Sequence, residues 1–299
     1  MRRKSGGKWT GLSGLSRIES LTPVPSFIQM LRQFIALTMA VIGAALPLTV
    51  TAQTASSKIG IVIMHGKGGS PTRHVSDLAS SLEEKGYLVA NLEMPWSGRR
   101  DYDVNVSAAE KEVESALATL RSKGAQKVFV AGHSQGGLFA LYFGGKHLVD
   151  GVIAIAPGGS VSSAVFRGKL GESVERARKL VAEGKGDEKT RFNDYEGSKG
   201  TYPIITTPAA YLSWFDPDGA MNQTMAVKTM NPQVPVLFIV PKADYPGLLK
   251  VKQTMFDSLP KNPLSKLYEP DSSHLGAPSA SRDEIVRWTT EVVSTRSGG

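Results

Sequence analysis

A short apolar segment, Lys127–Ala131 (KVFVA), runs without a loop into Gly132-His133-Ser134-Gln135-Gly136 and then into a predicted helix. A strand that turns straight into a helix strains the backbone of the middle residue, and side chains two residues before and after it would collide. Gly132 and Gly136 carry no such side chains, so Ser134 is expected to be exposed at the turn. The alternative is a glycine-rich turn with a spectator serine, but the strand-and-helix context favours an activated serine.

From Lys58 onward, strand-like and helix-like segments alternate along the chain. Helices such as Thr72–Lys85 have apolar residues at helical spacing and separate the apolar runs. This alternation predicts an α/β fold with a mostly parallel central sheet and helices on both faces. The six predicted strands are Ile59–Met64, Tyr87–Met94, Lys127–Ala131, Gly151–Ala156, Val234–Val240 and Leu264–Glu269.

The alternation stops between Pro157 and Gln233, that is, over residues 157–233. This segment contains an amphipathic helix, Glu172–Glu183, a loop rich in Gly, Lys and Asp, and an aromatic patch, TPAAYLSWF. An insertion between strands of such a sheet is expected to pack over their carboxyl ends, where sites form. We therefore predict a helical cap.

A second glycine-rich loop, His65-Gly66-Lys67-Gly68-Gly69, follows the first predicted strand. A loop in this place can bring a second backbone N–H to an oxyanion, beside that of Gln135. Lys67 is the predicted donor and Gly66 the next choice, with the Lys67 side chain expected to face solvent. The loop does not fit a phosphate-binding G-x-x-x-x-G-K-[ST] motif.

A serine hydroxyl needs a base to become a good nucleophile, and the chain has only five histidines. His65 and His133 belong to the two glycine-rich turns, while His74 and His147 lie at the ends of predicted helices. His274 alone lies in a loop after the last predicted strand, so it is the predicted base. A loop histidine without a catalytic role is the alternative.

The third member of a triad is a carboxylate that orients the base. Asp244 follows the predicted strand Val234–Val240 and stands between the serine and the histidine in chain order. Its rivals are Asp271, three residues before His274, and Asp216 and Asp218 in the predicted cap. Topology favours Asp244.

Together, His65-Gly66, the turn Gly132–Gly137, Asp244 and His274 resemble the α/β-hydrolase superfamily in its serine esterase and lipase-like branch. The resemblance covers roughly residues 58–296 and implies an eight-stranded type of sheet, no cofactor, and hydrolysis through an acyl-enzyme. The expected partner is a small-molecule ester. Thioesterase, amidase or peptidase activity would use the same triad, and a binding protein that kept the fold is a further alternative.

Aromatic side chains suggest where such a substrate binds. Trp96 and Trp214, with Tyr211 and Phe215, could line a pocket for a hydrophobic acyl group, although aromatic residues in a cap more often only pack. Arg99-Arg100 could contact an acidic substrate, but a solvated pair is the simpler interpretation.

Charge and metal-ligand patterns exclude other classes. Six of the 35 basic residues and one of the 27 acidic residues fall within residues 1–52, which leaves 29 against 26. Such a balance does not favour nucleic-acid binding. The histidines show no paired spacing such as H-x-x-x-H, and there are no cysteines, so no metal site is predicted.

The N-terminus has the features of an export signal. Phe34–Val50 is uncharged and apolar, Arg32 precedes it, and Val50 and Ala52 have the small-residue spacing of a signal-peptidase site. We predict that translation starts at Met30, that residues 1–52 form an extension plus signal peptide, and that residues 53–299 form the mature periplasmic or secreted domain. An uncleaved membrane anchor is the alternative, and only that form would contact the membrane.

Overall fold

The computed structural model describes residues 58–197 and 199–297, which belong to one compact unit, Ala55–Gly299. The predicted leader, residues 1–52, lies outside the described residues, so the export signal and the start at Met30 stay predictions. Within the described part of the chain, no helix is both long and apolar enough to cross a membrane.

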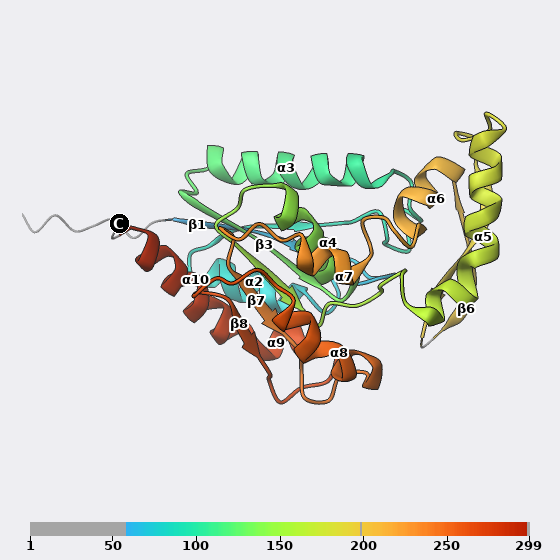
Figure 1. Ribbon diagram of the computed structural model, residues 1–299. Helices are drawn as coiled ribbons and strands as arrows, with labels where there is room; N and C mark the ends of the chain where they lie inside the picture. The colour runs from blue at the N-terminus through green and yellow to red at the C-terminus, as the bar shows by residue number, and fades with distance from the viewer. Residues whose placement is uncertain (1–57, 198, 298–299) are drawn as a thin grey trace, which may run out of the picture. The chain divides into compact units, whose positions relative to one another are not determined.

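Six parallel strands form the central sheet in the order β2-β1-β3-β4-β7-β8 (Figure 1). All six strands predicted from the sequence are present, and the mostly parallel α/β architecture is confirmed. The eight strands that the resemblance implied are not all in this sheet, because two further described strands form a separate ribbon. The bounds are β1 Ile59–Met64, β2 Leu88–Leu92, β3 Lys127–His133, β4 Gly151–Ile155, β7 Val236–Ile239 and β8 Lys266–Tyr268.

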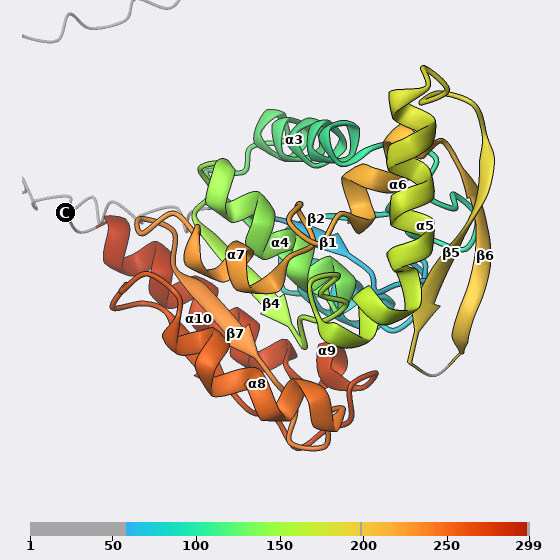
Figure 2. The same cartoon turned by 45° about the vertical axis from the view of Figure 1, so that its right-hand side comes forward.

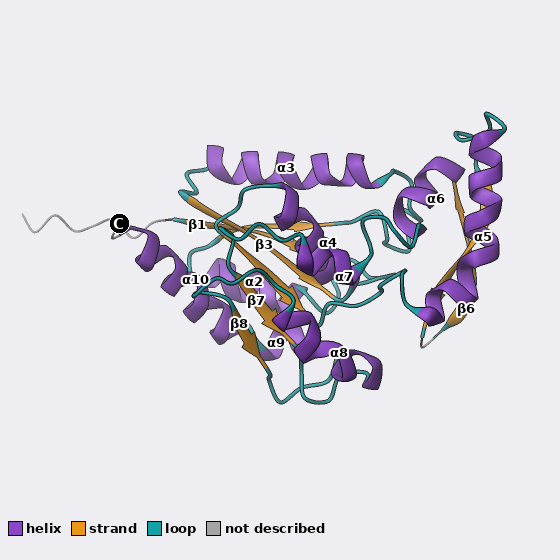
Figure 3. Ribbon diagram, in the orientation of Figure 1, coloured by secondary structure: helices purple, strands orange, loops and turns teal. Residues whose placement is uncertain are grey.

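Helices cover both faces of the sheet (Figure 3). One face packs against α3 (Val106–Ser122), α4 (Gln135–Lys146), α7 (Gln223–Lys228) and α8 (Pro246–Asp257). The other packs against α2 (Ser76–Glu84), α9 (Ala277–Ala280) and α10 (Arg282–Ser297). Because both faces are covered, β4 and β7 are buried along their whole length, which explains their unbroken apolar sequences.

The segment between β4 and β7 contains the predicted cap, residues 157–233, and it is only partly helical. Between α5 (Ala164–Ala182) and α6 (Pro208–Phe215), an antiparallel ribbon pairs β5 (Thr190–Glu196) with β6 (Gly200–Thr206). The sequence predicts a polar loop there, so the ribbon is a correction to that prediction. Figure 2 shows α5 and the ribbon side by side at one edge of the molecule.

Candidate active site

Ser134 lies in a strained turn between β3 and α4, with φ 55° and ψ −115°. Side chains at the two flanking glycines would not fit. A Cβ on Gly132 would lie 2.1 Å from the carbonyl oxygen of Gly136, and one on Gly136 would lie 2.5 Å from that of Met64. Non-glycine residues rarely adopt positive φ, and such strain persists only where the surroundings hold it. The turn predicted from G-x-S-x-G therefore exists, with Ser134 at its apex.

The loop after β1 lies directly against this turn. Met64 is paired with Gly132 in the sheet, and a Cβ on Gly66 would lie 3.2 Å from Ser134 Cβ. His65 holds the loop in place: its Nδ1–H donates to the Gly66 carbonyl (2.7 Å), and its Nε2 accepts from Met94 N–H (3.0 Å). Burial lowers the pKa of His65, which keeps the imidazole neutral and able to serve as this acceptor.

The two N–H groups predicted to face an oxyanion belong to Lys67 and Gln135. Within the described residues, neither backbone N–H donates a hydrogen bond. Gln135 is the first residue of α4, where the helix leaves its N–H groups without internal partners. Ser134 is half-buried, and unpaired backbone donors close to such a serine are what an oxyanion site requires.

His274 is placed beside the serine turn, and Asp244 is its partner. His274 Nδ1–H donates to Asp244 Oδ1 at 2.7 Å, and the two residues are each only 6% exposed. Asp244 follows β7 and His274 follows β8, and a bridge between Ala243 and Ser273 holds the two loops together. The structure thus brings together the predicted base and acid at the carboxyl edge of the sheet, and leaves Nε2 of His274 as the nitrogen that can act on a proton.

The rival acids are engaged elsewhere. Asp271 is 85% exposed at its side chain and pairs with Lys242. Asp216 pairs with Arg178 on the surface of the cap, and Asp218 is exposed. None of the three is recorded in contact with His274, which has Asp244 as its carboxylate partner.

His133 makes a contact that was not predicted from the sequence. Its Nε2–H donates to the backbone carbonyl of His274 at 2.9 Å, and the two ring centroids are 4.9 Å apart. Burial and the neighbouring His274 lower the pKa of His133 to about 3, so the ring stays neutral at ordinary pH. The residue beside Ser134 therefore anchors the loop that carries the base.

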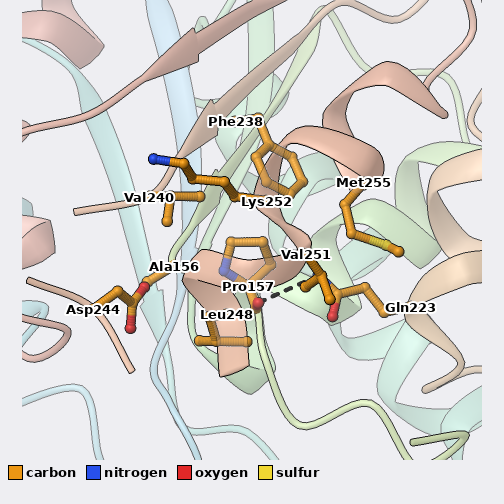
Figure 4. A pocket seen from close by; sticks show the side chains of 10 residues that line it. All are labelled: Ala156, Pro157, Gln223, Phe238, Val240, Asp244, Leu248, Val251, Lys252 and Met255. Carbon is orange, nitrogen blue, oxygen red and sulfur yellow. Dashed lines mark hydrogen bonds between the residues drawn. The ribbon is translucent and has the colours of Figure 1, made fainter. Parts of the chain in front are cut away.

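A small cavity, with a volume of about 10 Å³, lies beside Asp244 (Figure 4). Pro157, Gln223 and Leu248 are among the residues that line it, and Gln223 Nε2 donates to the Pro157 carbonyl. Asp244 Oδ2 is buried and has no hydrogen-bond partner among the described residues, while Oδ1 also accepts from Tyr245 N–H. The same oxygen, Asp244 Oδ1, thus accepts hydrogen bonds from His274 and from the backbone N–H of Tyr245.

The aromatic residues predicted to bind substrate lie in the core instead. Trp96 is 2% exposed and Trp214 is 1% exposed, and each indole N–H donates to a backbone carbonyl, of His65 and Val104 respectively. Tyr211 and Phe215 are also buried. Packing is the role that the structure gives these residues, so the predicted acyl pocket of Trp96 and Trp214 is not supported.

Two predictions about basic side chains have different outcomes. The Lys67 side chain does not face solvent: it is 9% exposed and forms an ion pair with the buried Asp194. Arg99 and Arg100 form ion pairs with nearby glutamates: Arg99 with Glu93, and Arg100 with Glu112 at 2.7 Å. These partners favour the structural interpretation of the arginines over contact with an acidic substrate.

Among the described residues, no group of three or more His, Cys, Asp or Glu side chains could hold a metal ion. The arrangement places a serine in a strained turn close to a histidine that is paired with a buried carboxylate.

Comparison with known proteins identifies the family of the chain and its fold. The family model described as serine aminopeptidase, S33, a hydrolase family, matches residues 55–261. No curated protein matches the sequence.

Several solved structures share the fold at low sequence identity. A monoacylglycerol lipase from Paleococcus ferrophilus has 21% identity and a TM-score of 0.55, over 78% of this chain and 94% of that one. A metagenome-derived lipolytic enzyme from the study of LipS and LipT has 18% identity and a TM-score of 0.51, over 81% and 95%. The α/β-hydrolase GrgF from Penicillium sp. has 14% identity and a TM-score of 0.59, over 81% and 91%.

Proposed function

Because the chain belongs to the serine aminopeptidase S33 family of α/β-hydrolases, we propose that it is a serine hydrolase that cleaves carboxylic esters. The observation that carries this proposal is the buried His274–Asp244 pair beside the strained turn of Ser134. A fold alone does not establish activity, but here each required group is present at the same edge of the sheet.

In the first half of the proposed reaction, His274 Nε2 takes the proton of Ser134 as the serine oxygen attacks the ester carbonyl. Asp244 accepts from Nδ1–H and stabilises the imidazolium that forms. The tetrahedral oxyanion accepts hydrogen bonds from the backbone N–H groups of Lys67 and Gln135. Loss of one such donor typically raises a barrier by about 3 kcal/mol.

The second half releases the products. His274 gives its proton to the leaving alcohol, which breaks the ester bond and leaves the acyl group on Ser134. Water, activated by the same imidazole, then attacks the acyl-enzyme, and the acid departs as Ser134 regains its proton. The chain needs no cofactor in this scheme.

Two features support the proposal that the substrate is an ester with an apolar group. Solved structures of this fold include a monoacylglycerol lipase and Est1E from Butyrivibrio proteoclasticus with ferulic acid bound. Large apolar side chains also remain exposed on either side of the base: Tyr245 is 50% exposed, with its ring 4.5 Å from that of His274, and Leu275 is 48% exposed. Exposed apolar surface beside a site is suited to an apolar ligand.

The family description favours one alternative, an aminopeptidase. Such an enzyme must recognise the free α-ammonium of its substrate, which calls for an available acid near the serine. Asp194, the buried acid of the cap, is already paired with Lys67. A comparison of p-nitrophenyl esters with aminoacyl p-nitroanilides decides between the two: faster turnover of the anilides would replace the ester proposal.

Labelling with a fluorophosphonate probe tests the proposal directly. Wild-type protein is expected to be modified at Ser134, as located by mass spectrometry, and Ser134→Ala and His274→Ala are expected to abolish labelling and ester hydrolysis. Ser122→Ala, at the exposed end of α3, is the matched control and should label normally. A folded wild-type protein that does not label would favour a non-catalytic binding protein instead.

We also propose that the protein is exported, on the basis of the N-terminal sequence described above. N-terminal sequencing of protein from the periplasm or medium is expected to give a start near Gln53. A start upstream of Phe34, in protein recovered from membranes, would support the uncleaved anchor.

A further inference from the structure

Asp194 is a fully buried acid in the cap ribbon, at 0% exposure. Its Oδ1 accepts from Lys67 Nζ at 2.5 Å and from Tyr195 N–H at 2.6 Å. Its Oδ2 accepts from the hydroxyls of Tyr102 (3.0 Å) and Tyr202 (2.9 Å). A buried carboxylate is tolerated only when it is paired and hydrogen-bonded, and four donors meet that need here.

One of these donors belongs to a residue of the proposed oxyanion site. Lys67 reaches from the loop after β1 into the cap, where Nζ also donates to the Tyr195 carbonyl at 3.2 Å. Nζ lies 5.2 Å from the centre of the Phe166 ring and 5.5 Å from that of Phe215. The side chain is thus held on several sides, which restrains the loop that carries the backbone N–H of the same residue.

Tyr102 links Asp194 to the other residue of the proposed oxyanion site. Its hydroxyl donates to Asp194 Oδ2 and accepts from Gln135 Nε2 at 3.3 Å. Complete burial, with Asp194 adjacent, raises the pKa of Tyr102 well above its ordinary value, so the hydroxyl keeps its proton. The path Gln135–Tyr102–Asp194–Lys67 therefore joins the two proposed oxyanion donors through the cap.

The backbone around Tyr102 is strained, and the cap holds it. Asp101 and Tyr102 have φ values of 50° and 58°. The carbonyl of Tyr102 accepts from the Thr206 hydroxyl (2.6 Å), and Asp101 Oδ2 accepts from Ile205 N–H (3.0 Å). Strained residues that persist because neighbouring structure holds them are typical of functional sites.

We propose that Asp194 is a positioning residue for the oxyanion site: it holds Lys67 directly and Gln135 through Tyr102. This inference rests on the proposed function. Its consequence is that the oxyanion geometry depends on the β5–β6 ribbon, which lies beside α5 in Figure 2. The cap then contributes to the rate of the reaction.

Asp194→Asn keeps the shape of the side chain and removes its charge. A misplacement of about 1 Å at a reacting group can lower a rate about 100-fold. We therefore expect kcat for a p-nitrophenyl ester to fall roughly 10- to 100-fold with KM changed less than about twofold, because an oxyanion interaction is made mainly in the transition state. A trifluoromethyl ketone, which forms a tetrahedral adduct with the serine, should bind more weakly by about the same factor as kcat falls. Glu175→Gln, an exposed acid-to-amide change in α5, is the control and should match wild type.

A matched tyrosine pair separates positioning from stability and applies even if Asp194→Asn does not fold. Tyr102→Phe and Tyr202→Phe each remove one hydrogen bond to Asp194 Oδ2, but only Tyr102 also contacts Gln135. Tyr102→Phe is expected to lower kcat and ketone affinity several-fold more than Tyr202→Phe does. Equal effects of the two variants would overturn the proposal, as would wild-type kcat in folded Asp194→Asn. The proposed function fails separately, if the wild-type protein itself neither labels at Ser134 nor turns over esters.

Discussion

Replacing Gly132 by alanine tests the reasoning about the serine turn with a single methyl group. The new Cβ would lie 2.1 Å from the carbonyl oxygen of Gly136, 2.2 Å from its carbonyl carbon and 2.7 Å from Gly137 N. Favourable non-bonded contacts are about 3.5–4.0 Å between carbon atoms, so the overlap exceeds about 1 Å. All three atoms are backbone of the first turn of α4, which cannot rotate away as a side chain can.

The expected loss of stability follows from that overlap. Overpacking that side chains can absorb costs about 1–3 kcal/mol, so a clash between rigid backbone segments should cost at least about 3 kcal/mol. In a domain of this size each kcal/mol lowers Tm by about 2–4 °C, which gives a fall of at least about 6 °C. Relief of the clash requires a shift of about 1 Å in the first turn of α4, which carries Ser134 and Gln135 with it. Labelling by a fluorophosphonate should therefore slow by about 100-fold in whatever protein stays folded.

A glycine-to-alanine substitution at an open position should instead raise Tm. Gly168, in the exposed face of α5, would place a Cβ with nothing within 4 Å. Alanine in a helix interior is favoured over glycine by about 0.5–1 kcal/mol, so Gly168→Ala should raise Tm by about 1–4 °C. Thermal melts followed by circular dichroism compare the two variants. If Gly132→Ala melts within about 2 °C of wild type and labels at the wild-type rate, the steric account of the turn is refuted.

Two further predictions concern the acid and the histidine beside the serine. Asp244→Asn is expected to lower kcat by on the order of 10⁴, because a triad carboxylate sets the tautomer of its imidazole. Asp271→Asn is the control and should leave kcat unchanged. Loss of activity in the Asp271 variant instead would mean that the acid is misassigned. His133 has a pKa of about 3 in the folded protein, against 6.5 for an exposed histidine. Between those values only the unfolded chain binds the proton, so the free energy of unfolding should fall as pH drops from 6.5 toward 3, by up to about 1.4 kcal/mol per pH unit. Urea unfolding of wild type and His133→Gln from about pH 7 to about pH 4 measures this, and an unchanged slope in the variant would assign the titration to other groups.

The central sheet and the serine turn could be predicted because their causes are local. An unbroken apolar run such as Gly151–Ala156 indicates a strand covered on both faces, and the structure has β4 there. The glycines at 132 and 136 remove a clash between residues four apart, and so short a spacing is visible in the sequence itself. His274 and Asp244 were found by their order after the last strands, since the carboxyl ends of parallel strands meet at one edge.

The cap was predicted less well because hydrophobicity alone does not distinguish the buried face of its strand β5 from the exposed face. In β5, Phe192 and Asp194 are both buried, while Arg191 and Asn193, which alternate with them, are exposed. This is a period of two, as in a strand, but one of the inward residues is an acid, so the segment resembles a polar loop. The aromatic residues Trp96 and Trp214 pose the converse problem, since composition does not distinguish a core side chain from one that lines a pocket.

The contact between Lys67 and Asp194 has no local signal at all, because the two residues lie 127 positions apart. In the sequence, a lysine in a glycine-rich loop is expected to be solvated, since a buried ammonium needs a partner that no nearby residue supplies. The fold supplies it by placing the ribbon over the loop. A buried acid in an inserted segment is therefore a reason to search for a buried base in the core, and here that search leads from the cap to the two residues proposed to bind the oxyanion. The sequence predicted those residues from their backbone N–H groups, while the structure shows that their side chains tie the same two positions to the cap.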